Sequence, residues 1–514
     1  MDRNQILITI IIVVYFAVTV FIGLMSSRKT KSAAAFTGVA LSTFAIVCAS
    51  TGEWLGGTAT TGVSEYGFLY GLSGWWYTIA NGIGVLFLGL LFAKLFRSLE
   101  TGTVPGIIEK FFGVNARTVS CIILTIVMLA VGLSQMIAAG KLGENLLGIP
   151  FWISCVAFAI IFIVYTLAGG MNAVASTNVL HLIVMYVGVI VAMVIAIVGA
   201  GGFKGFSDGI TALGNMEGEK SFWNMFSIGG SKVSSWIIAS LLGACTAQAG
   251  LQPVLSARSA SQARKACIIT AFVAAPFGFF TAFLGMASRV MFEKDATFLP
   301  AIERTAEGIK IAGKSALPEL MMNQTVMHPI VGGLVLAAIL AAVLSTVSPI
   351  ILASGTMVTR DVYQRVLHPE ASDEQVLKMG RITTAISGVI CCVGAIFLWK
   401  ASAVLELVYA AYSLRGALFL VVLFGIYWKR SSQKGAIWAM WLTAIVAIAW
   451  VGYKLAAGHY PIVIGSFAIS ETYAAVVVAA VCTIVFSLIF KPSALEQSER
   501  EQTKKALKEA MAKA

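Results

Sequence analysis

The sequence predicts an all-α integral membrane protein with about thirteen transmembrane helices. Of its 514 residues, 58% are hydrophobic and only 12% are charged, whereas soluble globular proteins carry about 25% charged residues. A helix needs about 20 apolar residues to cross a bilayer, and apolar stretches of that length recur along the chain. These observations exclude an ordinary soluble enzyme, a disordered protein and a nucleic-acid-binding protein, despite the net charge of +12.

The lysines and arginines indicate how the chain lies in the membrane. Cytoplasmic loops of membrane proteins are enriched in these residues. If the N-terminus is outside and the C-terminus inside, most basic loop residues, such as Arg258, Arg264 and Lys429, fall on the cytoplasmic side. We therefore predict an N-out, C-in topology with one membrane domain over residues 1–490. Residues 491–514 are expected to form a solvated, polar, helical tail in the cytoplasm.

The second apolar stretch, residues 40–62, is unusual for a membrane helix. It reads AIVCASTGEWLGGTATTG from Ala45 to Gly62 and places Gly, Ser, Thr and the acidic Glu53 at membrane depth. Glycine weakens a helix, and Ser and Thr compete for its backbone hydrogen bonds. The pattern therefore predicts a broken helix whose free carbonyls line a cavity, as in the cation sites of secondary transporters. Tight helix packing through small residues is the alternative.

Two charges of opposite sign, Glu53 and Arg415, lie inside predicted spans. A charged side chain at the centre of a membrane helix costs about 2.5–3.5 kcal/mol and is expected to face a cavity or a partner. The two residues can neutralise each other, or one of them can meet the charged end of a solute. The sequence leaves both alternatives open.

The ninth stretch, residues 329–353, carries the hydroxyl groups of Ser345, Thr346 and Ser348 at membrane depth, followed by Pro349. Oxygen ligands suit a hard cation such as Na⁺. Hydrogen bonding of these hydroxyls to the preceding helical turn is the alternative. The residues alone favour neither.

The sequence does not support an enzyme or an ATP-driven pump. Its four histidines are scattered, its eight cysteines lie in apolar runs without metal-ligand spacing, and it contains no P-loop motif. We expect no cofactor. The expected partners are a small-molecule solute, a coupling ion and the lipid bilayer, with no nucleic acid and no obligate protein partner.

Four motifs resemble the sodium/solute symporter family. They are LAGGMNAVASTN (167–178), GLQPVLSARSAS (250–261), ILAAVLSTVSPIILASGTMVTRDVYQ (339–364) and IYWKRSSQKGA (426–436). The resemblance covers roughly residues 5–490 and implies a leucine-transporter-type fold of two inverted five-helix repeats, at about 40–200 and 234–428. It also implies Na⁺-coupled symport by alternating access in the plasma membrane, which in a bacterium is the inner membrane.

The resemblance further implies a sodium site between the broken first core helix and the eighth core helix. The corresponding ligands are the backbone carbonyls of Ile46, Ala49 and Ala342 and the hydroxyls of Ser345 and Thr346. The chain departs from many relatives at Asn178 and His181, where they carry Asp and Gln. An acid-assisted exit of Na⁺ along the sixth span is therefore not expected. Because Pro349 interrupts the polar run of the ninth span, we expect one Na⁺ per cycle.

A solute site is expected beside the break. The candidate residues are Glu53, Trp54, Trp75, Trp76, Tyr77, Trp236, Gln248, Gln252, Tyr412 and Arg415. The motifs EWLGG, GLQPVLSARSAS and EASDEQVLKMGRIT look most like the choline-transporter branch, and aromatic rings with an acid suit a quaternary ammonium. Because Arg415 suits a carboxylate, the acid and the arginine together suit a zwitterion. Trp75 and Trp76 can instead belong to the interfacial aromatic belt.

The prediction is thus sodium-coupled symport of a small organic solute, with a zwitterion or amine such as an amino acid, betaine or choline favoured. The alternatives are a proton-coupled transporter that uses Glu53, and a sodium symporter of a carboxylate or a sugar. A channel would need a continuous polar stripe, and the sequence shows isolated polar segments instead.

Overall fold

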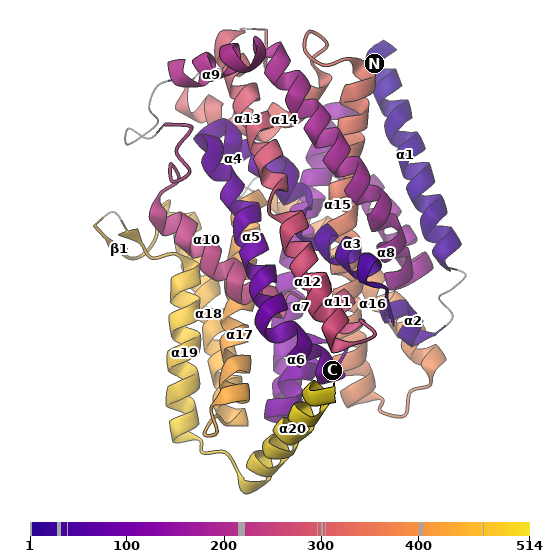
Figure 1. Ribbon diagram of the computed structural model, residues 1–514, viewed down its shortest axis with the longest axis vertical. Helices are drawn as coiled ribbons and strands as arrows, with labels where there is room; N and C mark the ends of the chain where they lie inside the picture. The colour runs from indigo at the N-terminus through magenta and orange to yellow at the C-terminus, as the bar shows by residue number, and fades with distance from the viewer. Residues whose placement is uncertain are drawn as a thin grey trace.

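The computed structural model is built almost entirely of helices, most of which run along its long axis (Figure 1). It describes residues 3–27, 32–38, 40–213, 221–295, 297–299, 302–303, 305–399, 404–465 and 467–513. The elements of the first half are α1 (Arg3–Ser27), α2 (Ala33–Thr37), α3 (Thr43–Trp54), η1 (Thr58–Gly62), α4 (Val63–Tyr70), η2 (Gly71–Trp75), α5 (Trp76–Phe87), η3 (Leu88–Phe92), α6 (Ala93–Ser98), α7 (Val104–Leu147), α8 (Phe151–Gly199) and α9 (Gly202–Ala212). Those of the second half are α10 (Gly230–Gly243), η4 (Ala244–Thr246), α11 (Gln248–Leu255), α12 (Ala260–Ala274), α13 (Phe277–Lys294), α14 (Ala306–Met322), α15 (Pro329–Met357), η5 (Val358–Leu367), α16 (Asp373–Leu398), α17 (Val404–Tyr427), α18 (Gln433–Ala457), β1 (Val463–Ile464), β2 (Phe467–Ala468), α19 (Glu471–Ile489) and α20 (Ala494–Lys513). The short antiparallel pair β1–β2 forms the only sheet among the described residues, so the all-α prediction is confirmed.

The second predicted span is broken, as the sequence predicts. α3 ends at Trp54, and the chain resumes as a π-helical turn at Thr58 before α4 begins at Val63. Glycine at position 56 lets the break lie against α15, because a Cβ there would approach Thr346 Oγ1 to 2.3 Å. Any side chain at this position would therefore push the two helices apart.

The seventh predicted span is also interrupted. α10 with η4 and α11 meet at Ala247 with a bend of 44°. The two broken spans contact each other, since Ser50 Oγ on α3 donates a 2.9 Å hydrogen bond to Gly250 O on α11. Because these spans open the two predicted five-helix repeats, the interruptions fall at equivalent places in the repeats.

One long helix contains two predicted spans. α8 turns sharply at Gly170, which has a φ of 53° and separates the fifth span from the sixth. A Cβ at this glycine would lie 2.5 Å from Phe36 O, so both the positive φ and the close approach of α2 require glycine here. The predicted spans therefore outnumber the continuous helices.

Each predicted span contains helix, interrupted at the breaks described above, while residues 402–403 of the eleventh span lie outside the described residues. Ten described helices are long and apolar enough to cross a membrane, or eleven when α10 and α11 count as one span. The count of thirteen and the N-out orientation remain predictions.

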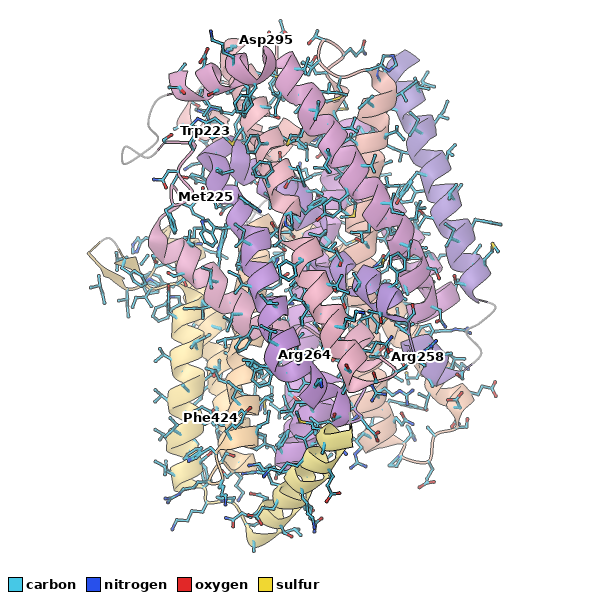
Figure 2. The ribbon with its side chains drawn as sticks, in the orientation of Figure 1. Trp223, Met225, Arg258, Arg264, Asp295 and Phe424 are labelled. Carbon is cyan, nitrogen blue, oxygen red and sulfur yellow. The ribbon has the colours of Figure 1, made fainter. Side chains whose placement is uncertain are left out.

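The chain ends lie toward opposite ends of the long axis (Figure 1). The N-out topology puts two long loops, residues 201–233 and 291–328, outside. Trp223 and Asp295, from these loops, lie toward one end of the molecule, with Arg258 and Arg264 in the other half (Figure 2).

The C-terminal helix α20 differs from the solvated tail that the sequence predicts. It crosses the end of the molecule near α6 and α17 (Figure 1) and contacts α6 and α7. Arg500 is only 3% exposed and Leu507 only 7%. One side of this polar helix is therefore docked on the protein, and the other side faces solvent.

Candidate functional site

Two hydroxyl groups of α15 lie against the break in the second span. Thr346 Oγ1 donates a 2.5 Å hydrogen bond to Gly52 O, and Ser345 Oγ lies 3.4 Å from the same oxygen. Both hydroxyl oxygens also lie close to Ala342 O, one turn earlier on α15, at 2.8 Å from Ser345 and 3.2 Å from Thr346. Oxygen atoms from two helices thus converge at one buried point, which is what a hard cation needs.

The remaining predicted ligands are buried on the helix that breaks. Ile46 and Ala49 lie within the last three turns of α3 and are fully buried, as is Ala342. α3 packs against α15. The structure brings Ala342 and the two hydroxyls to the break, and it places Ile46 and Ala49 on the helix directly before it.

Two amide side chains add to the polar surroundings of the break. Gln135 on α7 donates from Nε2 to Thr58 Oγ1 at 2.8 Å, and its buried Oε1 has no hydrogen-bond partner among the described residues. Asn178 on α8 lies 3.4 Å from Ser345 O through Nδ2. Since position 178 is Asn, it brings no charge to the hydroxyl pair. The sequence analysis did not select Gln135, whose signal is a single amide in the apolar run LSQMIAA.

Glu53 and Arg415 form an ion pair deep in the protein. Glu53 Oε1 lies 3.6 Å from Arg415 Nη1, and both side chains are 0% exposed. No described residue donates to the carboxylate oxygens or accepts from the guanidinium nitrogens. A buried ion pair is stabilising only when its other donors and acceptors are satisfied. This pair therefore has unused capacity for a polar ligand.

Aromatic rings enclose this ion pair. The Arg415 guanidinium lies 3.5 Å from the ring centroid of Tyr412 and 5.2 Å from that of Trp54. The Tyr77 hydroxyl is 3.4 Å from the Tyr412 hydroxyl. Trp54, Tyr77, Tyr412 and the two charged residues therefore form one cluster, and all five are among the residues predicted for the solute site.

Tyr409 links Trp236 to the same cluster. The Tyr409 and Trp236 rings stack with centroids 4.6 Å apart and an interplanar angle of 4°. Tyr409 also lies 5.7 Å from both Tyr77 and Tyr412, centroid to centroid. Tyr409 was not among the predicted residues. Its signal is the spacing of three from Tyr412, which puts both rings on one face of α17.

Trp75 and Trp76 make their contacts elsewhere. Their indole N–H groups donate to Ala275 O and Met225 O, each at 2.8 Å. Their ring partners are phenylalanines outside the cluster, and both side chains are partly exposed. These contacts suit the alternative role of interfacial anchors, and a role in solute binding remains a prediction.

Gln248 and Gln252 lie on α11, on the predicted cytoplasmic side of the bend. Gln248 Oε1 accepts a 2.7 Å hydrogen bond from Val104 N at the start of α7. Gln252 Nε2 donates to Thr37 O at 2.7 Å and lies 3.4 Å from Thr356 Oγ1. Within the described chain, neither glutamine hydrogen-bonds to the buried ion pair. Both amides instead tie backbone segments together at this end.

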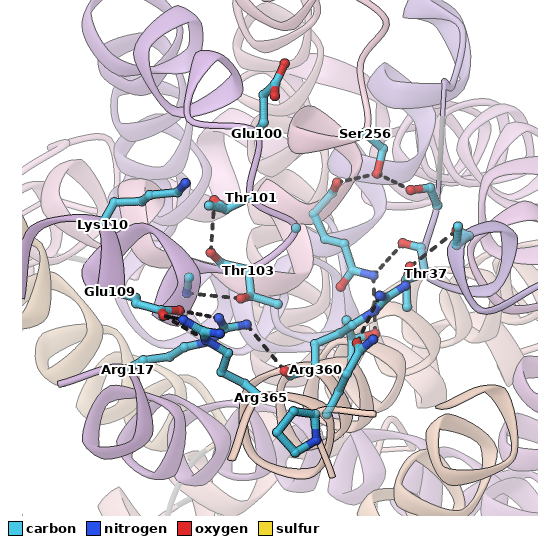
Figure 3. Close-up of a pocket in the computed structure, with 18 of the residues that line it drawn as sticks. Thr37, Glu100, Thr101, Thr103, Glu109, Lys110, Arg117, Ser256, Arg360 and Arg365 are labelled. Atoms are coloured by element: carbon cyan, nitrogen blue, oxygen red, sulfur yellow. Dashed lines mark hydrogen bonds and ion pairs between the residues drawn. The ribbon is translucent and has the colours of Figure 1, made fainter. Parts of the chain in front are cut away.

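A cavity of about 800 Å³ lies at the predicted cytoplasmic end (Figure 3). Gln252 is one of the residues that line it. Charged side chains from α7 and η5 form one side of it. Arg117 pairs with Glu109 and, at 2.5 Å, with the fully buried Asp361. Arg365 pairs with Glu109 at 2.5 Å. The cavity is therefore polar and reaches inward as far as the α11 glutamine.

Comparisons with known proteins identify the family. A sequence model of the Sodium:solute symporter family matches residues 36–443. The chain belongs to this family. A sodium/glucose cotransporter of Vibrio parahaemolyticus is 25% identical over 82% of this chain and 81% of its own length. A sodium/proline symporter of Staphylococcus aureus is 24% identical over 97% of this chain and 96% of its own.

Two solved structures share the fold. A Na⁺-coupled sialic acid symporter, in a substrate-bound outward-open state, superposes with a TM-score of 0.75 at 18% identity, covering 96% of this chain and 99% of that one. A nucleobase-cation-symport-1 family transporter, in a closed conformation with bromovinylhydantoin bound, gives a TM-score of 0.55 at 14% identity, covering 91% and 97%. The predicted leucine-transporter-type fold is thereby confirmed.

The symporter is thus a multi-pass membrane protein that couples solute movement to Na⁺. The bacterial relatives support a location in the plasma membrane. The names of the relatives refer to glucose, proline and sialic acid. The resemblance to the choline-transporter branch therefore remains a prediction.

Proposed function

We propose that this symporter binds one Na⁺ between α3 and α15 and a zwitterionic solute between Glu53 and Arg415. The Na⁺ ligands are hydroxyls of α15 and backbone carbonyls of α15 and of α3, the helix that ends at the break. They are Ile46, Ala49, Ala342, Ser345 and Thr346. The proposal needs no protein partner.

The convergence of Ser345 and Thr346 on the carbonyl of Gly52 supports the Na⁺ site. Two hydroxyl oxygens lie within 3.4 Å of a carbonyl oxygen at a helix break. A Na⁺ ion would replace the hydrogen bonds of these hydroxyls, and oxygen atoms from both helices would coordinate it.

The ion pair supports a zwitterionic solute. A solute carboxylate would accept from Arg415, and its amine would lie against Glu53, so every buried charge keeps a partner of opposite sign. A choline-like cation fits less well, because the faces of Trp54 and Tyr412 are already within cation–π distance of Arg415. An uncharged sugar has no charges to pair with Glu53 and Arg415, so the two side chains would remain paired with each other.

The backbone couples the two sites. Gly52, whose carbonyl meets Thr346, directly precedes Glu53. Na⁺ binding would order this segment and position the Glu53 carboxylate for the solute. The membrane potential contributes about 2.3 kcal/mol per charge per 100 mV to inward movement. The large cavity in contact with Gln252 offers the route by which both ligands leave toward the cytoplasm.

The Na⁺ site is tested by the thermal stability of the purified protein in NaCl and in KCl of equal concentration. A ligand that binds only the folded state raises its stability. We expect Na⁺-specific stabilisation of the wild type and its loss in Ser345→Ala/Thr346→Ala. Ser354→Ala, a change at another buried hydroxyl of α15, should respond like the wild type.

An absence of Na⁺-specific stabilisation in the wild type would overturn the site. Uptake driven by a pH gradient and abolished by Glu53→Gln would then support proton coupling instead. With Na⁺ present, we expect amino acids or betaines to stabilise the protein further. A larger effect of choline, simple carboxylates or sugars would contradict the zwitterion proposal.

A further inference from the structure

A second, smaller cavity lies at the predicted cytoplasmic end, between α20 and the turn that follows α17. Its volume is about 200 Å³, and its lining residues are Lys429, Arg430, Gln497, Arg500, Glu501 and Lys504. Four of the six are cations and one is an acid. Among the described residues, none of the four cations has a carboxylate within ion-pairing distance. This cavity takes no part in the proposed ion and solute sites.

Arg500 is the buried member of this cluster. Its Nε donates to Phe111 O at 3.2 Å, and its Nη1 donates to Lys429 O at 3.3 Å and to Ser431 Oγ at 2.9 Å. The side chain is only 3% exposed, and Nη2 has no hydrogen-bond partner in the described part of the chain. Glu496 acts on Arg500 through its charge but lies beyond ion-pairing distance. A buried cation with an unused donor and no carboxylate in contact is unfavourable unless an anion completes it.

The electrostatics of the cluster agree with this need. Burial, followed by the charges of Arg500 and Lys429, lowers the pKa of the Lys504 ammonium. Burial also lowers the pKa of Arg500. An anion in the cavity would relieve the repulsion among these groups.

A purely structural role for Arg500 explains part of the geometry. Arg500 ties α20 to the carbonyl of Lys429, just beyond the C-terminal end of α17, where a cation is favourable, and to the carbonyl of Phe111 on α7. That role accounts for Nε and Nη1. It does not account for the free Nη2, or for three more cations around the same cavity.

We propose that this cavity binds the phosphate group of an anionic ligand. Guanidinium and ammonium groups together are the usual protein partners of phosphate. Two sources of that group fit the position. Nearby apolar side chains of α17, α19 and α20 are exposed (Tyr427 69%, Ile489 62%, Leu495 68%), which places the cavity beside a lipid-facing surface, so the headgroup of an anionic phospholipid is one source. Free inorganic phosphate is the other.

Occupancy of this site would act on the larger cavity as well. α20 also presents Glu499 and Thr503 to the wall of the 800 Å³ cavity. An anion held by Arg500 and Lys504 would fix the same helix in its docked position. We therefore expect the ligand to stabilise the exit side of the symporter.

The test uses the full-length protein in detergent at fixed Na⁺ and ionic strength, with thermal stability as the readout. The probes are inorganic phosphate against chloride, and short-chain phosphatidylglycerol against phosphatidylcholine of the same chain length. The test variant is Lys429→Gln/Lys504→Gln, which removes two charges from the cavity. The matched control is Lys505→Gln/Lys508→Gln, which removes two exposed charges from the same helix.

We expect phosphate or phosphatidylglycerol to stabilise the wild type and the control equally. The cavity variant should bind the same probe roughly 30-fold more weakly, from the loss of two charges at the site. A response to phosphatidylglycerol alone identifies a lipid headgroup, and a response to phosphate alone identifies free phosphate. If neither probe acts, or if both double variants respond alike, the site does not exist.

Discussion

Glu53 Oε1 lies 3.6 Å from Arg415 Nη1, with both side chains fully buried. The residue before Glu53 is Gly52, whose carbonyl oxygen accepts the 2.5 Å hydrogen bond from Thr346. One peptide unit therefore separates the proposed ion site from the proposed solute site. Because the connection is so short, binding at one site can change the geometry of the other directly, without a long chain of contacts.

The ion pair predicts a non-additive mutant cycle. Glu53→Gln and Arg415→Gln each leave one buried charge without its partner, which should lower the free energy of unfolding by about 3–5 kcal/mol. The double substitution leaves no unpaired charge and should be less destabilising than the sum of the single ones. The stabilities of the wild type, the two single variants and the double variant are measured by thermal unfolding without solute. Additive losses would show that the two charges do not interact.

The helices and the break follow from local sequence. Apolar runs of membrane length give the helices, and the glycines around Leu55 give the break where the structure has it. Ser345 and Thr346 stand out in the sequence as hydroxyls inside an apolar run, although only the family resemblance favours a Na⁺ site there over hydrogen bonds to the preceding turn. These features depend on residues that are close in the chain.

The missed features depend on tertiary packing. Gln135 reaches the break from α7, and Tyr409 completes the aromatic cluster only because α17 and α10 lie side by side. Gln248 looked like a solute ligand, yet its partner is the backbone of Val104. The docking of α20 through Arg500 also escaped detection, because a charged helix with regular Glu–Lys spacing is typical of a solvated surface.

The close approach at Gly56 predicts a specific loss of the Na⁺ response. A Cβ there would lie 2.3 Å from Thr346 Oγ1 and 2.8 Å from Gln135 Oε1. Gly56→Ala should therefore destabilise the protein by about 1–3 kcal/mol through overpacking and abolish stabilisation by Na⁺. Gly452→Ala on α18, where a Cβ meets no atom within 4 Å, should stabilise by about 0.5–1 kcal/mol. If Gly56→Ala is still stabilised by Na⁺, Thr346 is not a ligand of the ion.

The two α11 glutamines should respond differently to truncation. Gln248→Ala leaves the N–H of Val104 buried without an acceptor, which should lower stability by about 1–3 kcal/mol. Gln252 lies in the cavity wall, where water can replace its amide, so Gln252→Ala should lower stability by less than about 1 kcal/mol. Thermal unfolding and solute uptake are measured for each. Equal destabilisation by both changes would argue against water access at Gln252.

The ion pairs beside the large cavity predict a contrast set by burial. Arg117 is the cation that faces the fully buried Asp361, at 2.5 Å, so Arg117→Gln leaves a buried carboxylate uncompensated and should lower the free energy of unfolding by about 3–5 kcal/mol. The side chain of Arg365 is 51% exposed, so Arg365→Gln should change stability by about 0–1 kcal/mol. Raising KCl at constant Na⁺ should weaken the contribution of Arg365 and leave that of Arg117 nearly unchanged, because salt screens exposed charges far more than buried ones. Thermal unfolding of both variants across a KCl series measures this contrast. A similar loss in the two variants would mean that water reaches Asp361.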